Sequence, residues 1–161
     1  MTKEEIQSFL LQGTFTGKLG TINKNETAHI VPIWYTLDKE DNIIFNTGKN
    51  SVKAKNIQRN NRVRLCVDDQ TPLYSFVTID GVAEIISNAD QKELFKWAKI
   101  IAARYMGNDK AEEYGRRNSS EGELLIKIKP TKVIEDIIIN LTYDKIFEYL
   151  IIKYRYSISK N

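Results

Sequence analysis

Hydrophobic and polar residues alternate along several short stretches of the chain, a pattern typical of strands with one buried face. The stretches that carry it are residues 14–23, 28–38, 42–47, 62–69, 73–87 and 123–139. The polar segments "KNET" and "DKEDN" separate the first three, so they predict hairpin turns. The pattern therefore predicts a sheet of about six antiparallel strands, with Gly81 bending or bulging the fifth.

A helical period of hydrophobic positions recurs in four other segments. They are residues 4–11, 51–60, 90–106 and 109–117. In the longest one, Leu94, Trp97, Ala98, Ile101, Ala102 and Tyr105 share one face, and Gly107 follows as a stop signal. Many strands and few helices indicate a mainly β (α+β) fold, a small barrel with peripheral helices.

The strand at 28–37 has two faces of different character. Alternation directs Val31, Ile33, Tyr35 and Leu37 towards the core and Ile30, Pro32, Trp34 and Thr36 away from it. Pro32 lacks a ladder donor, so we expect an edge strand there. Trp34 then either stacks on a flat aromatic ligand or packs in a subunit interface.

The segment "FNTGKNSVKAKN", residues 45–56, passes from a strand through a turn into a helix. Asn50 or Ser51 caps this helix, and Val52 and Ile57 form its apolar side. Free N–H groups, the Ser51 hydroxyl and the charges of Lys53 and Lys55 together supply the parts of a phosphate site. A capped surface helix with solvated lysines is the alternative interpretation.

Composition limits the remaining possibilities. A chain of 161 residues fits one domain, and a net charge of +3 is too small to indicate a nucleic-acid surface. The single cysteine, Cys66, predicts a buried free thiol in a reducing, cytoplasmic compartment. Neither a signal peptide nor a membrane span is expected.

The C-terminal segment differs from the rest of the chain. Residues 141–161 carry an apolar helical stripe with basic residues beside it, which predicts a helical extension to a domain of residues 1–140. Docking on the domain or on a partner subunit and binding at a membrane surface are the two interpretations, and the weak basic face favours docking.

The usual catalytic motifs are missing. His29 is the only histidine, so neither a zinc site nor a Cys-His pair can be assembled. There is no G-x-G-x-x-G fingerprint, and "TGKNS" lacks the spacing of a P-loop. If the protein is an enzyme, an organic cofactor is expected to carry the chemistry, and no side chain is assigned as catalytic.

The order of these segments resembles a known family. Residues 17–69, from "GKLGTIN" to "RLCVDD", followed by "FVTIDGVAEI", "ARYMG" and "LLIKIKPTKVI", resemble the pyridoxamine 5'-phosphate oxidase-like split β-barrel proteins, and among them the flavin- and deazaflavin-dependent oxidoreductases. The resemblance implies a homodimer that binds FMN, or the deazaflavin coenzyme F420, at the subunit interface and acts on a small-molecule substrate.

The resemblance also implies roles for individual residues. Ser51 and Lys53 would contact the cofactor phosphate with Lys55 beside them, and Asn46 and Thr47 would approach the ribityl chain. The backbone of Val31, Pro32, Ile33 and Trp34 would line the ring system. The candidates for the substrate side are Trp34, Tyr74, Phe76, Arg104 and Tyr105.

Departures from the family pattern restrict these expectations. The sequence lacks the arginine-rich substrate signature of the true oxidase, and Glu135 and Asp136 follow "KPTKVI" where many relatives have a tryptophan.

The leading hypothesis is an FMN-dependent oxidoreductase, with a deazaflavin-dependent reductase or a non-catalytic flavin carrier as alternatives. An RNA-binding barrel is disfavoured, because a phosphate site explains "KAKNIQRNNRVR" more economically.

Overall fold

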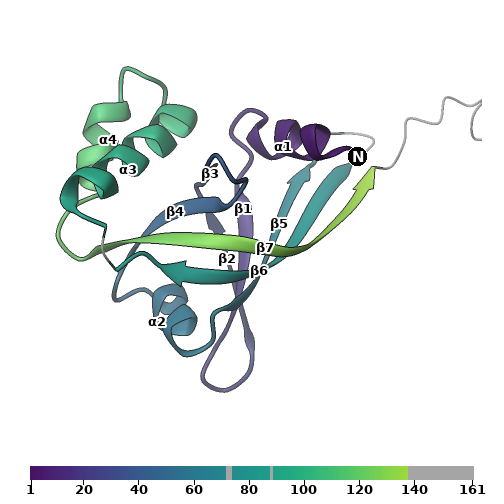
Figure 1. Ribbon diagram of the computed structural model, residues 1–161, viewed down its shortest axis with the longest axis horizontal. Coiled ribbons are helices and arrows are strands. Elements are labelled where there is room, and N and C mark those ends of the chain that lie inside the picture. The colour runs from purple at the N-terminus through teal and green to yellow at the C-terminus, as the bar shows by residue number, and fades with distance from the viewer. Residues whose placement is uncertain (72–73, 88, 138–161) are drawn as a thin grey trace, which may run out of the picture.

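The computed structural model describes residues 1–71, 74–87 and 89–137 of the chain, which form one antiparallel sheet with four helices around it (Figure 1). The strands are β1 (Gly17–Ile22), β2 (Ala28–Ile33), β3 (Thr36–Leu37), β4 (Ile43–Gly48), β5 (Arg62–Asp69), β6 (Ser75–Ile85) and β7 (Glu123–Ile137). The helices are α1 (Lys3–Leu11), α2 (Val52–Arg59), α3 (Gln91–Met106) and α4 (Ala111–Arg117).

The strand order explains the curvature of the sheet. The order is β2-β1-β5-β6-β7-β4-β3, so β2 and β3 lie at opposite edges. Yet only Trp34 and Tyr35 separate them in the chain. Two residues span at most about 7 Å, so the two edges must approach each other. The sheet is therefore curled, and the expected mainly β, split-barrel fold is confirmed.

Residues 28–38 form two strands where the sequence predicted one. β2 pairs with β1, whereas β3 pairs with β4 through Thr36↔Ile44 and Leu37↔Ile43. This division gives seven strands in place of about six. The expected edge at Pro32 is confirmed, because β2 has a single neighbour in the sheet. Thr36 was expected to point outward but is only 8% exposed.

The core fills the concave side of the curled sheet. Tyr35 and Phe45 are fully buried there, and Leu19, Leu65, Val77, Ile126 and Ile128 pack with them. The alternation along the strands sets this arrangement, as β5 shows with buried residues at every second position over its first six. Val31 and Leu37 contact the same core from its margin, as expected.

The longest strand pair contains the expected irregularity. β6 and β7 are in register from Ser75↔Ile137 to Asp80↔Lys132, and the register shifts between Asp80 and Gly81. A Cβ atom at Gly81 would lie 2.5 Å from Ile128 Cγ2 and 2.9 Å from the Lys129 carbonyl oxygen. Glycine is therefore required at this bulge.

Local signals fix the ends of the helices. The Thr2 hydroxyl accepts from the backbone N–H of Glu5 and caps α1, and the Asp90 carboxylate caps α3 in the same way. α3 ends at Gly107, whose φ of +88° lies in the region that favours glycine, as the sequence predicted. Figure 1 shows α3 and α4 side by side at one end of the sheet, with α1 over its other opening.

Two further expectations about single residues were wrong. Val52 was assigned to the apolar side of α2, but it is 49% exposed, and Ala54 and Ile57 make the buried contacts instead. Cys66 was expected to be buried, but it is half-buried because its strand position faces the outer side of the sheet. The proposed extension at 141–161, with a domain boundary at 140, lies outside the described residues.

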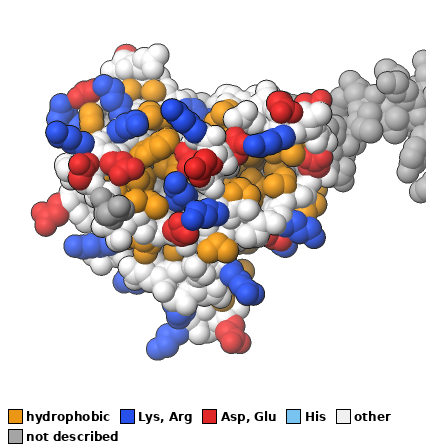
Figure 2. Space-filling model, in the orientation of Figure 1, with side chains coloured by type: hydrophobic (Ala, Val, Ile, Leu, Met, Phe, Trp, Pro, Cys, Tyr) orange, Lys and Arg blue, Asp and Glu red, His pale blue; other side chains and the backbone are white. Residues whose placement is uncertain are grey.

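The surface carries mixed charges. Figure 2 shows basic and acidic side chains interspersed over one face, with hydrophobic side chains visible between them. This distribution agrees with the small net charge of +3. Within the described ranges, no helix is both long and apolar enough to cross a membrane.

Candidate functional site

A cavity of about 290 Å³ opens where the end of β2, the middle of β4 and the start of α2 meet the α3–α4 pair. Its lining residues are Pro32, Ile33, Trp34, Asn46, Lys53, Ala98, Ile101, Tyr114, Arg117, Asn118 and Glu123. The cavity combines two cationic side chains, one carboxylate, two amides and aromatic rings. A ligand with a flat ring and an anionic group suits this combination.

The start of α2 is held rigidly beside the cavity. The Ser51 hydroxyl oxygen accepts a hydrogen bond from the Ala54 N–H at 3.2 Å and lies 3.0 Å from the Thr47 hydroxyl. On the other side of the helix, buried Asn56 donates to the Thr21 hydroxyl and the Asn23 side chain. These contacts fix the direction in which the free N–H groups of the first turn point.

Lys53 brings a positive charge from the first turn of α2 into the cavity. Its side chain is half-buried, and burial lowers the pKa of its ammonium group, an effect that the nearby Glu123 carboxylate opposes. No carboxylate of the described residues lies within ion-pair distance of it. A half-buried cation without a paired anion, at a helix start, favours an anionic ligand.

The side chain of Asn46 lies in an unusual environment. It lies on β4 opposite Leu125 of β7, and both of its amide atoms are buried without a hydrogen-bond partner among the described residues. A buried amide left unpaired costs about 1–3 kcal/mol, so its partner is expected from outside the chain. The side chain supplies one acceptor and an NH₂ donor to the cavity it lines.

Aromatic rings form one wall of the cavity. The Trp34 indole stacks on Tyr105 with centroids 5.0 Å apart and planes inclined by 3°, and Tyr114 is tilted against it at 6.2 Å. The Arg117 guanidinium lies 5.7 Å from the Tyr114 ring. α3 and α4 thereby hold Trp34 at the cavity margin.

Arg104 links separate segments of the fold through hydrogen bonds to backbone carbonyl oxygens. Its guanidinium donates to the carbonyl oxygens of Gly13 at 2.9 Å, Tyr35 at 3.0 Å and Leu10 at 2.8 Å. It also lies over the Tyr35 ring, whose phenol donates to the Leu10 carbonyl and whose pKa burial raises to about 12. Arg104 therefore joins α3 to the segment after α1 and to the β2–β3 connection.

The sequence profile of the family described as pyridoxamine 5'-phosphate oxidase matches residues 2–135. The chain belongs to this family. Among curated proteins, none matches the chain. The match covers the sheet except for the last two residues of β7, and it covers the cavity, so the resemblance noted in the sequence is confirmed.

Solved structures share the fold of this family member. A conserved hypothetical protein, Rv2991 from Mycobacterium tuberculosis, has a TM-score of 0.74 and 23% identity, covering 88% of each chain. An F420 reductase has a TM-score of 0.65 and 22% identity, covering 79% of this chain and 94% of its own. The heme storage protein HutZ from Vibrio cholerae has a TM-score of 0.65 and 15% identity, covering 84% and 95%. At these identities the likeness shows the fold alone.

The structure brings together most of the residues that the resemblance assigned to the cofactor. Pro32, Ile33, Trp34, Asn46 and Lys53 line the cavity. Behind them, Thr47 is buried and the hydroxyls of Thr47 and Ser51 lie together.

Two assigned residues do not line the cavity. The side chain of Val31 packs against the core, whereas the role expected of this residue was for its backbone. Lys55 is exposed and does not line the cavity, because two residues along a helix turn a side chain by about 200°.

The substrate-side candidates separate into two groups. Trp34 lines the cavity, and Arg104 and Tyr105 support its wall from α3. Tyr74 and Phe76 do not line the cavity. They lie at the beginning of β6. The other end of this strand is the one nearer to Asn46, because Ile85 pairs with Ile126, and Ile126 follows Leu125, the β7 partner of Asn46.

Sequence reasoning missed all the cavity residues that come from α3, α4 and β7, and four of them are polar or aromatic. Tyr114, Arg117 and Asn118 come from α4 and its C-cap, and Glu123 begins β7. The segment "EEYGRR" carried only a weak helical signal, and a charged residue at a strand start is common on surfaces. Only the packing of α4 near α2 reveals their shared position.

A second, larger recess lies on the outer face of the sheet. It has a volume of about 800 Å³ and is lined mainly by apolar surface of β1, β2, β5 and β6, including Ile22, Ile30 and Val82. Ile30 is 67% exposed. In the described part of the chain, no cluster of acidic, histidine or cysteine side chains is suited to a metal ion.

Proposed function

We propose that this protein is an oxidoreductase that binds FMN in the cavity beside α2 and transfers a hydride to or from a small organic substrate. The deazaflavin coenzyme F420 is the alternative cofactor. One observation carries the proposal: the Lys53 charge, the unpartnered Asn46 amide and the Trp34 indole line the same cavity. A cofactor with a phosphate, a polyol chain and a flat ring requires these three kinds of group.

The residues present fit such a cofactor. Lys53 and the first turn of α2 would hold the phosphate, and Ser51 would add its hydroxyl proton as a donor. Asn46 would give its buried amide to polar groups of the ribityl chain, with Thr47 beside it. Lys55 is exposed outside the cavity, so the phosphate contact is assigned to Lys53.

The chain itself needs no nucleophile for this function. A bound flavin supplies the hydride chemistry, and the protein positions the reactants and excludes water. Pro32, Ile33 and Trp34 form an apolar margin against which a ring can lie. The family match and the shared fold of an F420 reductase support an oxidoreductase.

We further propose that the active form is a homodimer. The apolar recess of about 800 Å³ and the exposed Ile30 on edge strand β2 favour burial against a second copy. Light scattering on the purified protein tests this: a dimer is expected, with Ile30→Asp shifting it towards monomer. A monomeric native protein would contradict this part of the proposal.

A non-catalytic flavin carrier is the second candidate. The fold is shared with the heme storage protein HutZ, so it is compatible with holding a cofactor without turnover. Steady-state reduction of the bound cofactor by a nicotinamide donor separates the two functions. Tight binding without any turnover would favour the carrier.

The first experiment is a visible absorption spectrum of the purified protein, before and after adding FMN or F420, followed by gel filtration. A shifted spectrum that comigrates with the protein is expected. Lys53→Ala should weaken retention strongly, whereas Lys55→Ala, on the same helix but outside the cavity, should retain the cofactor. Equal retention in both variants would refute the phosphate assignment.

A further inference from the structure

Glu123 places a negative charge in the same cavity as Lys53. It is the first residue of β7 and pairs with Gly48, the last residue of β4. Its Oε1 atom lies 3.5 Å from the position that a Cβ on Gly48 would take. The carboxylate therefore lies beside the turn that leads from β4 into α2, on the side where a phosphate would meet Lys53.

The position of Glu123 has an electrostatic cost that the chain does not offset. Burial raises the pKa of its carboxyl and lowers the pKa of the Lys53 ammonium, and each charge only partly relieves the other. Among the described residues, no ion pair joins either group to a partner.

We infer that Glu123 is a specificity-determining residue of the proposed phosphate site, where its carboxylate competes with the ligand's phosphate for Lys53. This inference rests on the proposed function. A dianionic phosphate that enters the cavity meets a like charge, so its binding is linked to uptake of a proton by Glu123. The residue thereby disfavours doubly charged phosphates and favours those with a single charge.

The other charged and titratable groups around Glu123 are cations or a phenol. Lys53 faces it from α2, and Tyr114 and Arg117 line the cavity from α4. Lys49 lies near the preceding Gly122 from the turn before α2. Glu123 is the one carboxylate of the described cavity lining, so it is the group whose negative charge a bound phosphate would oppose.

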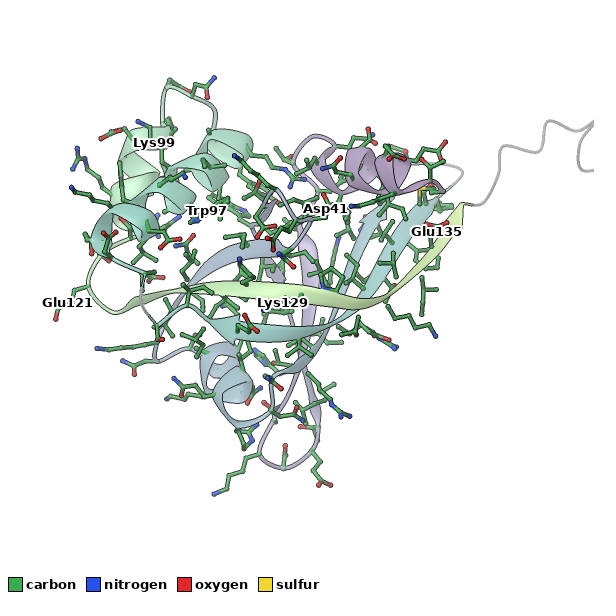
Figure 3. The ribbon with its side chains drawn as sticks, viewed as in Figure 1. Asp41, Trp97, Lys99, Glu121, Lys129 and Glu135 are labelled. Atoms are coloured by element: carbon green, nitrogen blue, oxygen red, sulfur yellow. The ribbon has the colours of Figure 1, made fainter. Side chains whose placement is uncertain are left out.

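The test compares dissociation constants for FMN, and for F420, between pH 5 and pH 8 in native protein, Glu123→Gln and Glu121→Gln. Glu121 is the matched control, because it is exposed, and Figure 3 shows it pointing away from the fold before β7. We expect Glu123→Gln to bind FMN roughly tenfold more tightly at pH 8, with the advantage shrinking as the pH falls. Free FMN titrates alike beside every variant, so a difference between Glu123→Gln and Glu121→Gln reports on the charge at position 123.

The outcomes separate this inference from the proposed function. If Lys53→Ala weakens binding but Glu123→Gln matches Glu121→Gln at pH 8, the competition is refuted and the phosphate site stands. Weaker binding by Glu123→Gln also overturns the inference, because the carboxylate would then hold the ligand directly. If neither cofactor binds the native protein, the proposed function fails and this inference with it.

Discussion

The indole ring of Trp34 lies flat on the phenol ring of Tyr105, with centroids 5.0 Å apart and planes 3° apart. The Tyr105 hydroxyl also donates to the Phe15 carbonyl oxygen at 2.8 Å. One side chain of α3 thus sets the orientation of Trp34 and holds the segment before β1. The wall of the cavity is consequently part of the packing of α3.

Removing the Tyr105 ring should release Trp34. We expect Tyr105→Phe to cost about 1 kcal/mol through the lost hydrogen bond, and Tyr105→Leu to cost at least about 1 kcal/mol more through the lost ring contact. Urea unfolding measures both. In a Trp97→Phe background, the fluorescence of Trp34 should shift to the red for Tyr105→Leu only. An unchanged spectrum in that variant would mean that other groups position the indole.

Replacing Arg104 should destabilise the protein more than replacing any exposed arginine. Arg104→Ala leaves the carbonyl oxygens of Gly13 and Tyr35 without this donor and removes one of the two donors to Leu10, so we expect a loss of about 2–4 kcal/mol. Arg116→Ala is the control, because Arg116 is exposed and its contacts are an ion pair with exposed Glu112 and a position 5.5 Å from the Phe95 ring. That change should cost about 0.5 kcal/mol or less. Similar melting temperatures for the two variants would contradict the structural role.

A methyl group at Gly81 should strain the β6–β7 bulge. Its Cβ would lie 2.5 Å from Ile128 Cγ2 and 2.9 Å from the Lys129 carbonyl oxygen, so we expect Gly81→Ala to cost about 2 kcal/mol. Gly20→Ala is the comparison, because its Cβ would meet only the Arg64 carbonyl oxygen at 3.4 Å. Denaturant unfolding of the two variants measures both costs. Equal midpoints would show that β7 can shift to accommodate the methyl group at Gly81.

The charges in the cavity should oppose stability. Because burial lowers the pKa of Lys53, its charge costs free energy at every pH below the folded pKa, and the cost disappears only above the unfolded value. Lys53→Met should therefore raise the melting temperature at pH 7 while it abolishes phosphate binding. The gain should stay below about 1 kcal/mol, since solvent screens a half-exposed charge.

Glu123 should make the stability of the folded protein depend on pH in the direction opposite to Lys53. Burial raises its pKa, so the free-energy cost of its negative charge in the folded protein is complete above the folded pKa and absent below the unfolded pKa. Glu123→Gln should stabilise the protein at pH 8 and have no effect near pH 4. Thermal unfolding across this range checks the sign, and a stabilisation that grew towards low pH would be incompatible with it.

Local patterns predicted most elements of the fold. Alternation located the long strands, and the period of Leu94, Ala98, Ile101 and Ala102 located α3 with its stop at Gly107. Ser51 was one of two expected caps, and it is the residue that caps α2. These features depend on neighbours in the sequence, so the sequence alone can show them.

Features that depend on distant contacts were not visible in the same way. The break between β2 and β3 follows from the pairing of Thr36 with Ile44, and the exposure of Val52 from the way α2 lies on the sheet. The residue types gave no sign that Tyr114 and Glu123 would share a cavity with Lys53. The unpaired state of Asn46 likewise emerges only when its surroundings are known.

The two-residue link at Trp34 and Tyr35 also bears on how the protein folds. The link is short, but β2 and β3 reach their positions through different neighbours at opposite edges of the sheet. The sheet also requires β4 to pair with β7, which joins residues as distant in the chain as Ile43 and Ile128, so this pairing is expected to form late and slowly. The cavity, which includes Trp34 from this link and Asn46 from β4, is then assembled in the last step of folding. A cofactor that binds there would slow unfolding and leave the initial rate of collapse unchanged.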